Sequence, residues 1–180
     1  HHAHIASCMA ENGLNNQKVI GVAFDGTGLG NDNHLWGAEF LVCNYRYFKR
    51  GCHLKEIPLL GGERAILEPV RVAAAWLYLI YKDKFLNLNF DWVKKTDKKK
   101  WQVLKNMYLS GFNSPLGSSM GRLFDAVGSI VLGKSKAGFE AEFAIGLEKI
   151  AKRYTLNAIR YNFKIIKNKD EYIIDHIPTF

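Results

Sequence analysis

Two groups of residues within the first thirty positions have the types and spacing of a binding site. Histidines open the chain at His1, His2 and His4, and imidazoles about one helical turn apart can share one transition-metal ion. An apolar segment then leads into the sequence DGTGLG at positions 25–30. Its glycines let backbone N–H groups converge on an oxyanion, and the carboxylate of Asp25 can hold a metal, a water or a hydroxyl group. The sequence therefore predicts a site that handles a metal together with a phosphate.

Each of these motifs also has a simpler interpretation. Histidines at a terminus can be a tag remnant or a solvated end, and a lone Gly-x-Gly-x-Gly can be a hairpin turn. The tag interpretation is disfavoured because Ile5, Met9 and Leu14 continue the segment as an apolar stripe with helical spacing. The hairpin turn stays open as the alternative to a phosphate loop.

The composition describes a chain that can bury a core. It has 180 residues, of which 48% are hydrophobic. It has no initiator Met, no signal-like segment and no apolar run near the roughly 20 residues that span a bilayer. Cys8, Cys43 and Cys52 form no CxxC pair, which argues against a disulfide framework and a thiolate zinc site. We expect a soluble, cytoplasmic, interior segment of a longer polypeptide, with no membrane contact.

The net charge of +8 is unevenly distributed, because six lysines lie between positions 94 and 105. No aromatic stacking platform accompanies them, so we favour a solvated helix face over a nucleic-acid or acidic-partner contact.

Apolar periodicity and turn residues predict the elements. A helix over 4–14 should precede a central strand over 19–24, a loop over 26–33 and two further strands over 35–42 and 45–57, as a meander. Helices should follow over 63–81, twice within 84–110, from an N-cap at Ser118-Ser119 through 132, and over 140–153. A hairpin should join strands over 158–166 and 171–174. The expected division is a sheet bearing the metal and phosphate loop in 1–62, a mainly helical part in 63–153, and a hairpin with a tail in 154–180.

Four segments resemble the carbamoyltransferase module of the HypF family of hydrogenase maturation factors, in the family's order: HHAHIASCMAENGL, VIGVAFDGTGLGNDNHLWGAEFL, GGERAILEPVR and SSMGRLFDAVGSIVLG. The resemblance implies an actin-like, ribonuclease H-like α/β lobe with a mixed sheet, packed helices and a helical insertion. It identifies the chain with the first lobe of a truncated module. The family's second lobe supplies further glycine-rich contacts and an aspartate for the metal, so we expect this chain to be catalytically incomplete alone.

The resemblance also implies an activity. Upstream domains of such proteins use carbamoyl phosphate and ATP to make carbamoyl-adenylate, and this module passes the carbamoyl group to the C-terminal cysteine of the partner HypE. The product becomes the cyanide ligand of nickel–iron hydrogenase. An O-carbamoyl or threonylcarbamoyl transferase would share the lobe and differ in acceptor, and a non-catalytic lobe that docks a partner protein is the alternative from another class.

The resemblance assigns roles to residues of the first third of the chain. His4 matches the second histidine of the family's pair for a divalent metal, zinc or iron. The first position of that pair falls just before His1. His1 could substitute geometrically as a metal ligand, but we favour it as a neighbour of the ligand. Asp25 is the expected catalytic carboxylate, beside a phosphate loop formed by Gly26, Thr27 and Gly28.

Further along, Arg71 is expected to bind a phosphate or carbamoyl oxygen through parallel guanidinium bonds. A buried ion pair with Glu68, three residues earlier, is nearly as good an interpretation. The expected nucleotide contacts are Gly61, Gly62, Gly121, Asp125 and Glu140. Asp125 would accept hydrogen bonds from ribose hydroxyls, and the alternative is an N-capped helix with an exposed polar face.

Overall fold

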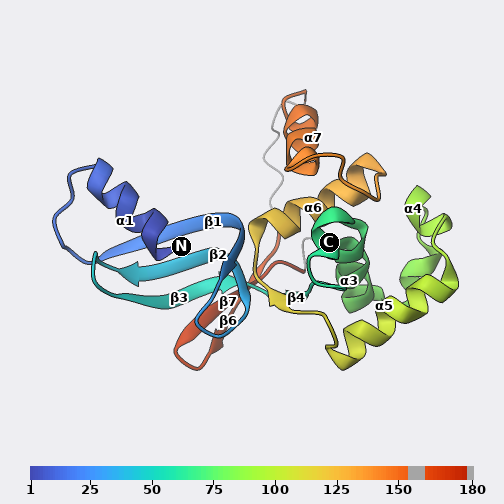
Figure 1. Cartoon of the computed structure of the whole chain (residues 1–180), viewed down its shortest axis with the longest axis horizontal. Coiled ribbons are helices and arrows are strands. Elements are labelled where there is room, and N and C mark those ends of the chain that lie inside the picture. The colour runs from blue at the N-terminus through green and yellow to red at the C-terminus, as the bar shows by residue number, and fades with distance from the viewer. Residues whose placement is uncertain (154–160, 178–180) are drawn as a thin grey trace. The chain divides into compact units, whose positions relative to one another are not determined.

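The computed structural model describes residues 1–153 and 161–177, and these form two compact units (Figure 1). The first unit contains residues 1–56, 118–120 and 161–177, and the second contains 57–117 and 121–153. Positions 158–160 of the predicted hairpin and the end of the predicted tail, 178–180, lie outside the described residues. Within the described part of the chain, no helix has the length and apolar character to cross a membrane.

A mixed sheet forms the first unit. Strands β1 (Val19–Leu29), β2 (Leu35–Cys43) and β3 (Phe48–Leu54) make an antiparallel meander. Strand β7 (Glu171–Asp175) pairs in parallel with β3 and antiparallel with β6 (Lys164–Asn168). The predicted meander and C-terminal hairpin are therefore present, and the hairpin belongs to the same sheet.

Strand β1 differs from the prediction in length and place. It runs through the glycine motif to Leu29, and a tight turn joins it to β2, with Gly30 N donating to His34 O at 2.9 Å. Asn33 closes this turn in the left-handed region (φ 63°), which asparagine tolerates. Among the described residues β1 pairs with β2 alone, and Ile20 and Val22 are 75% and 53% exposed. The predictions of a central strand ending at position 24 and of a loop from 26 are therefore wrong.

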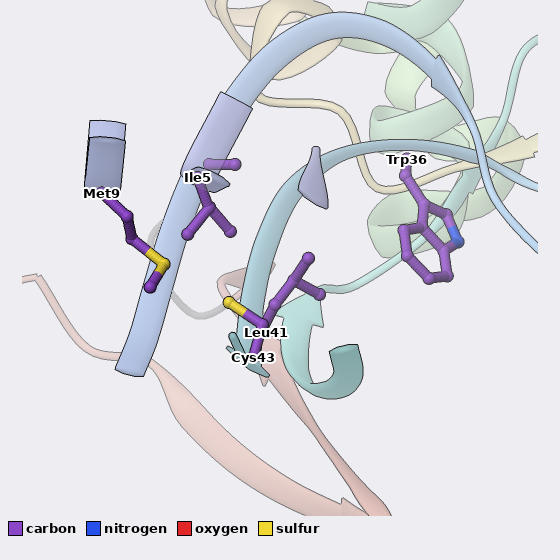
Figure 2. Close-up of a cluster of buried hydrophobic side chains, with 6 residues drawn as sticks. Ile5, Met9, Trp36, Leu41 and Cys43 are labelled. Carbon is purple, nitrogen blue, oxygen red and sulfur yellow. The ribbon is translucent and has the colours of Figure 1, made fainter. Parts of the chain in front are cut away.

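Helix α1 (His2–Glu11) covers one face of this sheet. Figure 2 shows Ile5 and Met9 of α1 beside Leu41 and Cys43 of β2, in a buried cluster that also contains Trp36. Burying a side chain such as Ile5 or Met9 contributes about 1.5–3 kcal/mol. Gly21 permits the close approach, because a Cβ there would lie 2.4 Å from Ile5 Cδ1. The helical stripe of Ile5 and Met9 is confirmed, whereas Leu14 lies beyond the helix.

The second unit is mainly helical. Its short strands β4 (Ile57–Pro58) and β5 (Leu116–Gly117) pair antiparallel. The helices are α2 (Arg64–Leu67), α3 (Val70–Tyr81), the 3-10 helix η1 (Lys82–Asn87), α4 (Asp91–Lys94), α5 (Lys98–Ser110), α6 (Met120–Leu132) and α7 (Glu142–Ala151). The helices expected to pack on the first sheet thus belong to this unit.

Local chemistry explains where these helices break. The predicted helix over 63–81 divides because Pro69 disfavours helical backbone at Glu68, which has φ −119° and ψ 72°. Asp97 is the N-cap of α5, and its carboxylate accepts from Lys99 N at 2.8 Å; the C-cap is Gly111, in the left-handed conformation. Lys98, Lys99 and Lys100 are exposed, as expected for a solvated helix face.

Candidate functional site

A bulge in β1 carries the glycine motif. Phe24 pairs with Ala38 and Gly28 with Trp36, so three residues, Asp25 to Thr27, stand opposite the single residue Gly37. A bulge of this kind interrupts the ladder and redirects a side chain. Asp25 is the first residue of this bulge.

The two carboxylate oxygens of Asp25 face different groups. Oδ1 accepts from the backbone N–H of Gly26 at 2.5 Å and from that of Thr27 at 3.4 Å. Oδ2 lies 3.8 Å from His1 Nε2 and 4.0 Å from His4 Nε2. His4 therefore points toward Asp25, and His1 belongs to the same group. In this structure the N–H groups of Gly26 and Thr27, expected to meet an oxyanion, meet the carboxylate of Asp25.

His1 and His4 differ in their surroundings. The His1 side chain is only 3% exposed, and its Nε2 atom has no hydrogen-bond partner among the described residues. Its ring lies against Gly28, where a Cβ would come within 2.4 Å of His1 Cε1. The His4 side chain is 70% exposed. A buried imidazole nitrogen without a partner, aimed at a carboxylate, fits the donor set of a transition metal.

His2 takes no part in this group. Its Nε2 atom lies 2.7 Å from the carbonyl oxygen of Asn44, and its ring lies against Phe48.

A second polar cluster includes residues of the β1–β2 turn. Asp32, His34 and Glu56 bring three possible metal-ligand atoms within 4.8 Å of one another. The Arg50 guanidinium already provides the cation there, with Nη1 3.2 Å from Asp32 Oδ2 and 3.5 Å from Glu56 Oε1. Burial acts to raise the pKa of Asp32, but hydrogen bonds from His34 and Trp36 and the Arg50 charge outweigh it and lower that pKa. We therefore interpret this cluster as an ion-pair network.

The same guanidinium binds a fully buried carboxylate on β2. Arg50 donates from Nε to Glu39 Oε2 at 2.6 Å and from Nη2 to Oε1 at 3.2 Å. Ser118 Oγ donates to Glu39 Oε1 at 2.6 Å, and Ser119 Oγ lies 3.0 Å from Asp25 O and 2.6 Å from Gly26 O. The two serines, expected from the sequence to cap a helix, thus bond to residues of β1 and β2.

The sequence did not identify Glu39 as a residue of this network, although a lone charge within the apolar segment LWGAEFLVC was a usable signal.

In the second unit, Arg71 is 7% exposed and bonded to Glu68. Its Nε lies 2.7 Å from Glu68 Oε2, and its Nη1 donates to Leu60 O at 3.2 Å. Burial opposes ionisation of Glu68, but the Arg71 hydrogen bond and the charges of Arg71, Lys100 and Arg64 outweigh it and lower the pKa of this carboxyl. This is the buried ion pair that the sequence offered as the alternative to an anion-binding role of Arg71.

Gly61 lies against Arg71, whereas Gly62 lies beside Asn113. Both have positive φ, 91° and 59°, and a Cβ on Gly61 would lie 2.8 Å from Arg71 Nη1. Arg71 and Glu68 also line a cavity of about 300 Å³, whose other walls include Trp92, Lys100 and Trp101.

The remaining predicted residues lie on or before α6 and α7. Asp125 is 6% exposed and pairs with Arg122 at 2.7 Å, so the alternative of an exposed polar face is wrong for this residue. Burial raises the pKa of Asp125, although the charge and hydrogen bond of Arg122 act against it. Gly121 lies in the first turn of α6, and Glu140 is exposed just before α7.

Comparisons with known proteins point to the same family as the four sequence motifs. Residues 21–180 match the family model described as the second subdomain of the Kae1-like domain of carbamoyltransferases. The sequence predicts the first lobe of the module, whereas the matched model describes a second subdomain. The chain is 38% identical to the carbamoyltransferase HypF of Synechocystis sp. over 160 residues, which cover 82% of this chain and 21% of that protein. It is also 38% identical to HypF2 of Cupriavidus necator over 154 residues, covering 86% of this chain and 18% of the relative.

Solved structures show the same fold. A full-length HypF in its phosphate- and nucleotide-bound form matches with a TM-score of 0.86 and 39% identity, over 97% of this chain and 22% of that one. HypF of T. kodakarensis matches with a TM-score of 0.80 and 30% identity, over 98% and 23%. The expected α/β fold with a mixed sheet is thereby confirmed, and the chain spans about a fifth of the length of these relatives. The chain belongs to the HypF carbamoyltransferase family.

Proposed function

We propose that this chain forms the metal-holding wall of a carbamoyl-transfer site in a HypF-type enzyme. The observation that carries the proposal is the convergence of His1 Nε2 and His4 Nε2 on Asp25 Oδ2, at 3.8 and 4.0 Å. The unpartnered, buried nitrogen of His1 supports it, because a buried polar atom without a partner is costly unless a ligand satisfies it.

His1, His4 and Asp25 would hold a divalent metal, and two imidazoles with one carboxylate suit zinc or iron. When bound, the ion supplies Lewis acidity toward a phosphate or carbonyl oxygen. Asp25 contributes one oxygen to the ligand set while its other oxygen stays bonded to the bulge. The carboxylate is thereby fixed in one orientation before any substrate arrives.

The substrate we propose is carbamoyl-adenylate, made from carbamoyl phosphate and ATP by other parts of the full-length protein. The acceptor would be the C-terminal cysteine of a HypE-like partner. A thiol acceptor needs a reducing compartment, and Cys8, Cys43 and Cys52 are all free. On this proposal Gly121, Asp125 and Glu140 contact the nucleotide. Gly61 lies beside Arg71, and a contact of Arg71 with a carbamoyl or phosphate oxygen would require its guanidinium to leave Glu68 or to bind both groups.

The test uses the full-length protein that contains this chain, supplied with carbamoyl phosphate, ATP and a HypE-like acceptor. Transfer is measured by mass spectrometry of the acceptor cysteine, and bound metal is measured on the same preparations. Asp25→Ala should abolish transfer and reduce the bound metal, while the melting temperature stays close to that of the parent. Normal transfer by Asp25→Ala would overturn the proposal. An active protein that carbamoylates a hydroxyl or amine instead of the cysteine would favour the related transferases.

A further inference from the structure

We propose that Ser119 and Gly37 are positioning residues, which hold the β1 bulge so that Asp25 Oδ2 faces His1 and His4. The inference rests on the proposed metal-holding function and names the residues on which that function depends indirectly. Neither residue donates an atom to the group formed by the two imidazoles and the carboxylate.

The bulge needs an anchor because its residues lie outside the regular ladder. Between the pairs Phe24–Ala38 and Gly28–Trp36, Asp25, Gly26 and Thr27 face only Gly37. Buried carbonyl groups that lose ladder partners must find other donors. Ser119 supplies one, with its Oγ 2.6 Å from Gly26 O and 3.0 Å from Asp25 O. A hydroxyl has a single hydrogen, so the two carbonyls share it.

Ser119 is well placed for this role because water has little access to it. The residue is 4% exposed. Its removal would take away the donor that the half-buried carbonyl oxygens of Asp25 and Gly26 share, and the bulge would be free to adopt another backbone conformation.

Gly37 fixes the bulge from the side of β2. A Cβ at this position would lie 2.6 Å from Asp25 O and 2.8 Å from both Cα and Cβ of Ser119. The three segments therefore meet at a distance that only glycine permits. Any larger residue at position 37 would push Asp25 and Ser119 apart.

Ser119 is itself held in place through its neighbour Ser118. Ser118 N donates to Leu35 O at 2.9 Å, and Ser118 Oγ donates to Glu39 Oε1 at 2.6 Å. Arg50 Nη2 donates to the same hydroxyl at 3.1 Å and to Glu39 Oε1 at 3.2 Å. These hydrogen bonds thus join the segment that carries Ser119 to β2 and β3.

The position of the bulge determines the direction of the carboxylate. Asp25 Oδ1 is bonded to Gly26 N within the bulge, so a rotation of the Asp25–Gly26 peptide would turn Oδ2 away from the histidines. Residues that orient a ligand without touching the metal commonly change metal affinity about 10–100-fold when mutated. Ser119 and Gly37 meet this description.

The experiment compares Ser119→Ala with Ser118→Ala in the full-length protein, using Co²⁺ as the probe. Affinity comes from titration, and ligand geometry from the visible absorption spectrum of the bound ion. Ser118→Ala is the matched control, because it removes a hydroxyl one residue away that bonds to Glu39 instead of the bulge. We expect Ser119→Ala to weaken Co²⁺ binding at least about tenfold and to alter the spectrum. Ser118→Ala should lower the melting temperature with a smaller change in affinity.

Gly37→Ala is the second variant, and it should weaken Co²⁺ binding at least as much as Ser119→Ala. Unchanged affinity and spectrum in both Ser119→Ala and Gly37→Ala would overturn the inference. Asp25→Ala separates this failure from failure of the proposed function. If Asp25→Ala loses Co²⁺ while Ser119→Ala and Gly37→Ala keep it, only the positioning role is wrong. If Asp25→Ala also keeps it, the metal site itself is wrong.

Discussion

His1 Nε2 lies 3.8 Å from Asp25 Oδ2, and the imidazole that carries it is almost fully buried beside Gly28. From the sequence we favour His1 as a neighbour of the metal ligand over a substitute for the first histidine of the expected metal pair. Its burial, its direction and its unpartnered nitrogen favour substitution. His1 is the N-cap of α1 and His4 lies in its first turn, and both rings come within about 4 Å of Asp25 Oδ2.

His1→Ala should therefore lower the affinity for a divalent metal at least as much as His4→Ala does. His2→Ala is the matched control, since His2 bonds to Asn44 O and not to Asp25. Titration of Zn²⁺ into each variant of the full-length protein checks this, with losses of about 10–100-fold expected for the first two when one ligand is removed. Equal affinities for His1→Ala and His2→Ala would assign His1 to packing alone.

Gly28→Ala should displace the His1 ring, because the new Cβ would lie 2.4 Å from His1 Cε1. Overpacking of this kind costs roughly 1–3 kcal/mol of folding free energy. We expect a lower melting temperature together with weaker metal binding. At Gly26 an added Cβ meets nothing within 4 Å, so Gly26→Ala is the steric control and should leave the His1 ring in place. A harmless Gly28→Ala would show that the ring has room to move.

Much of the fold could be predicted from local sequence because local chemistry specifies it. Alternation of apolar residues, the turn residues between strands and Pro69 mark elements that the structure contains, often within a few residues. The ending of β1 was mispredicted for a physical reason. A glycine-rich motif is compatible with both a loop and a bulged strand, and only pairing with β2 decides between them.

In the candidate site, too, some features follow from local sequence and others depend on long-range contacts. His4 and Asp25 are identifiable by their chemical type, whereas the role of Ser119 depends on a contact with Asp25 across 94 positions of sequence. Gly37 matters because two other segments approach its backbone, and no local pattern encodes that approach.

The stability of the first unit should depend on pH through His176. Burial lowers the pKa of this imidazole below its ordinary 6.5, and the nearby Lys55 charge acts in the same direction, against Ile174 and Asp175. The folded state therefore favours neutral His176, while the unfolded chain takes up a proton near pH 6.5. The stabilising contribution is fully present above that pH and decreases as the pH falls toward the lowered folded pKa.

Urea unfolding at several pH values, for the parent and for His176→Gln, checks this prediction. The parent should lose stability on acidification from pH 6.5, and the variant should lose less over the same interval. Parallel curves for the two proteins would show that other groups control the pH dependence.

Arg71 offers the sharpest choice between structure and catalysis. Breaking a buried ion pair by removing one partner costs about 3–5 kcal/mol, because a charge is left uncompensated, whereas replacing both partners by apolar or neutral groups is often nearly neutral. Arg71→Met would leave Glu68 with only Arg64 and Lys100, each at 3.5 Å and more exposed than Arg71. The variant should therefore be destabilised, and adding Glu68→Gln should restore most of the melting temperature. The deciding measurement is carbamoyl transfer by the stable double variant of the full-length protein. Restored stability without transfer would assign Arg71 an anion-binding role that its pairing with Glu68 conceals. Restored stability with normal transfer would show that Arg71, with the adjacent Gly61-Gly62 turn, contributes to folding stability and not to transfer. His1, His4 and Asp25 would then remain as the residues on which transfer depends.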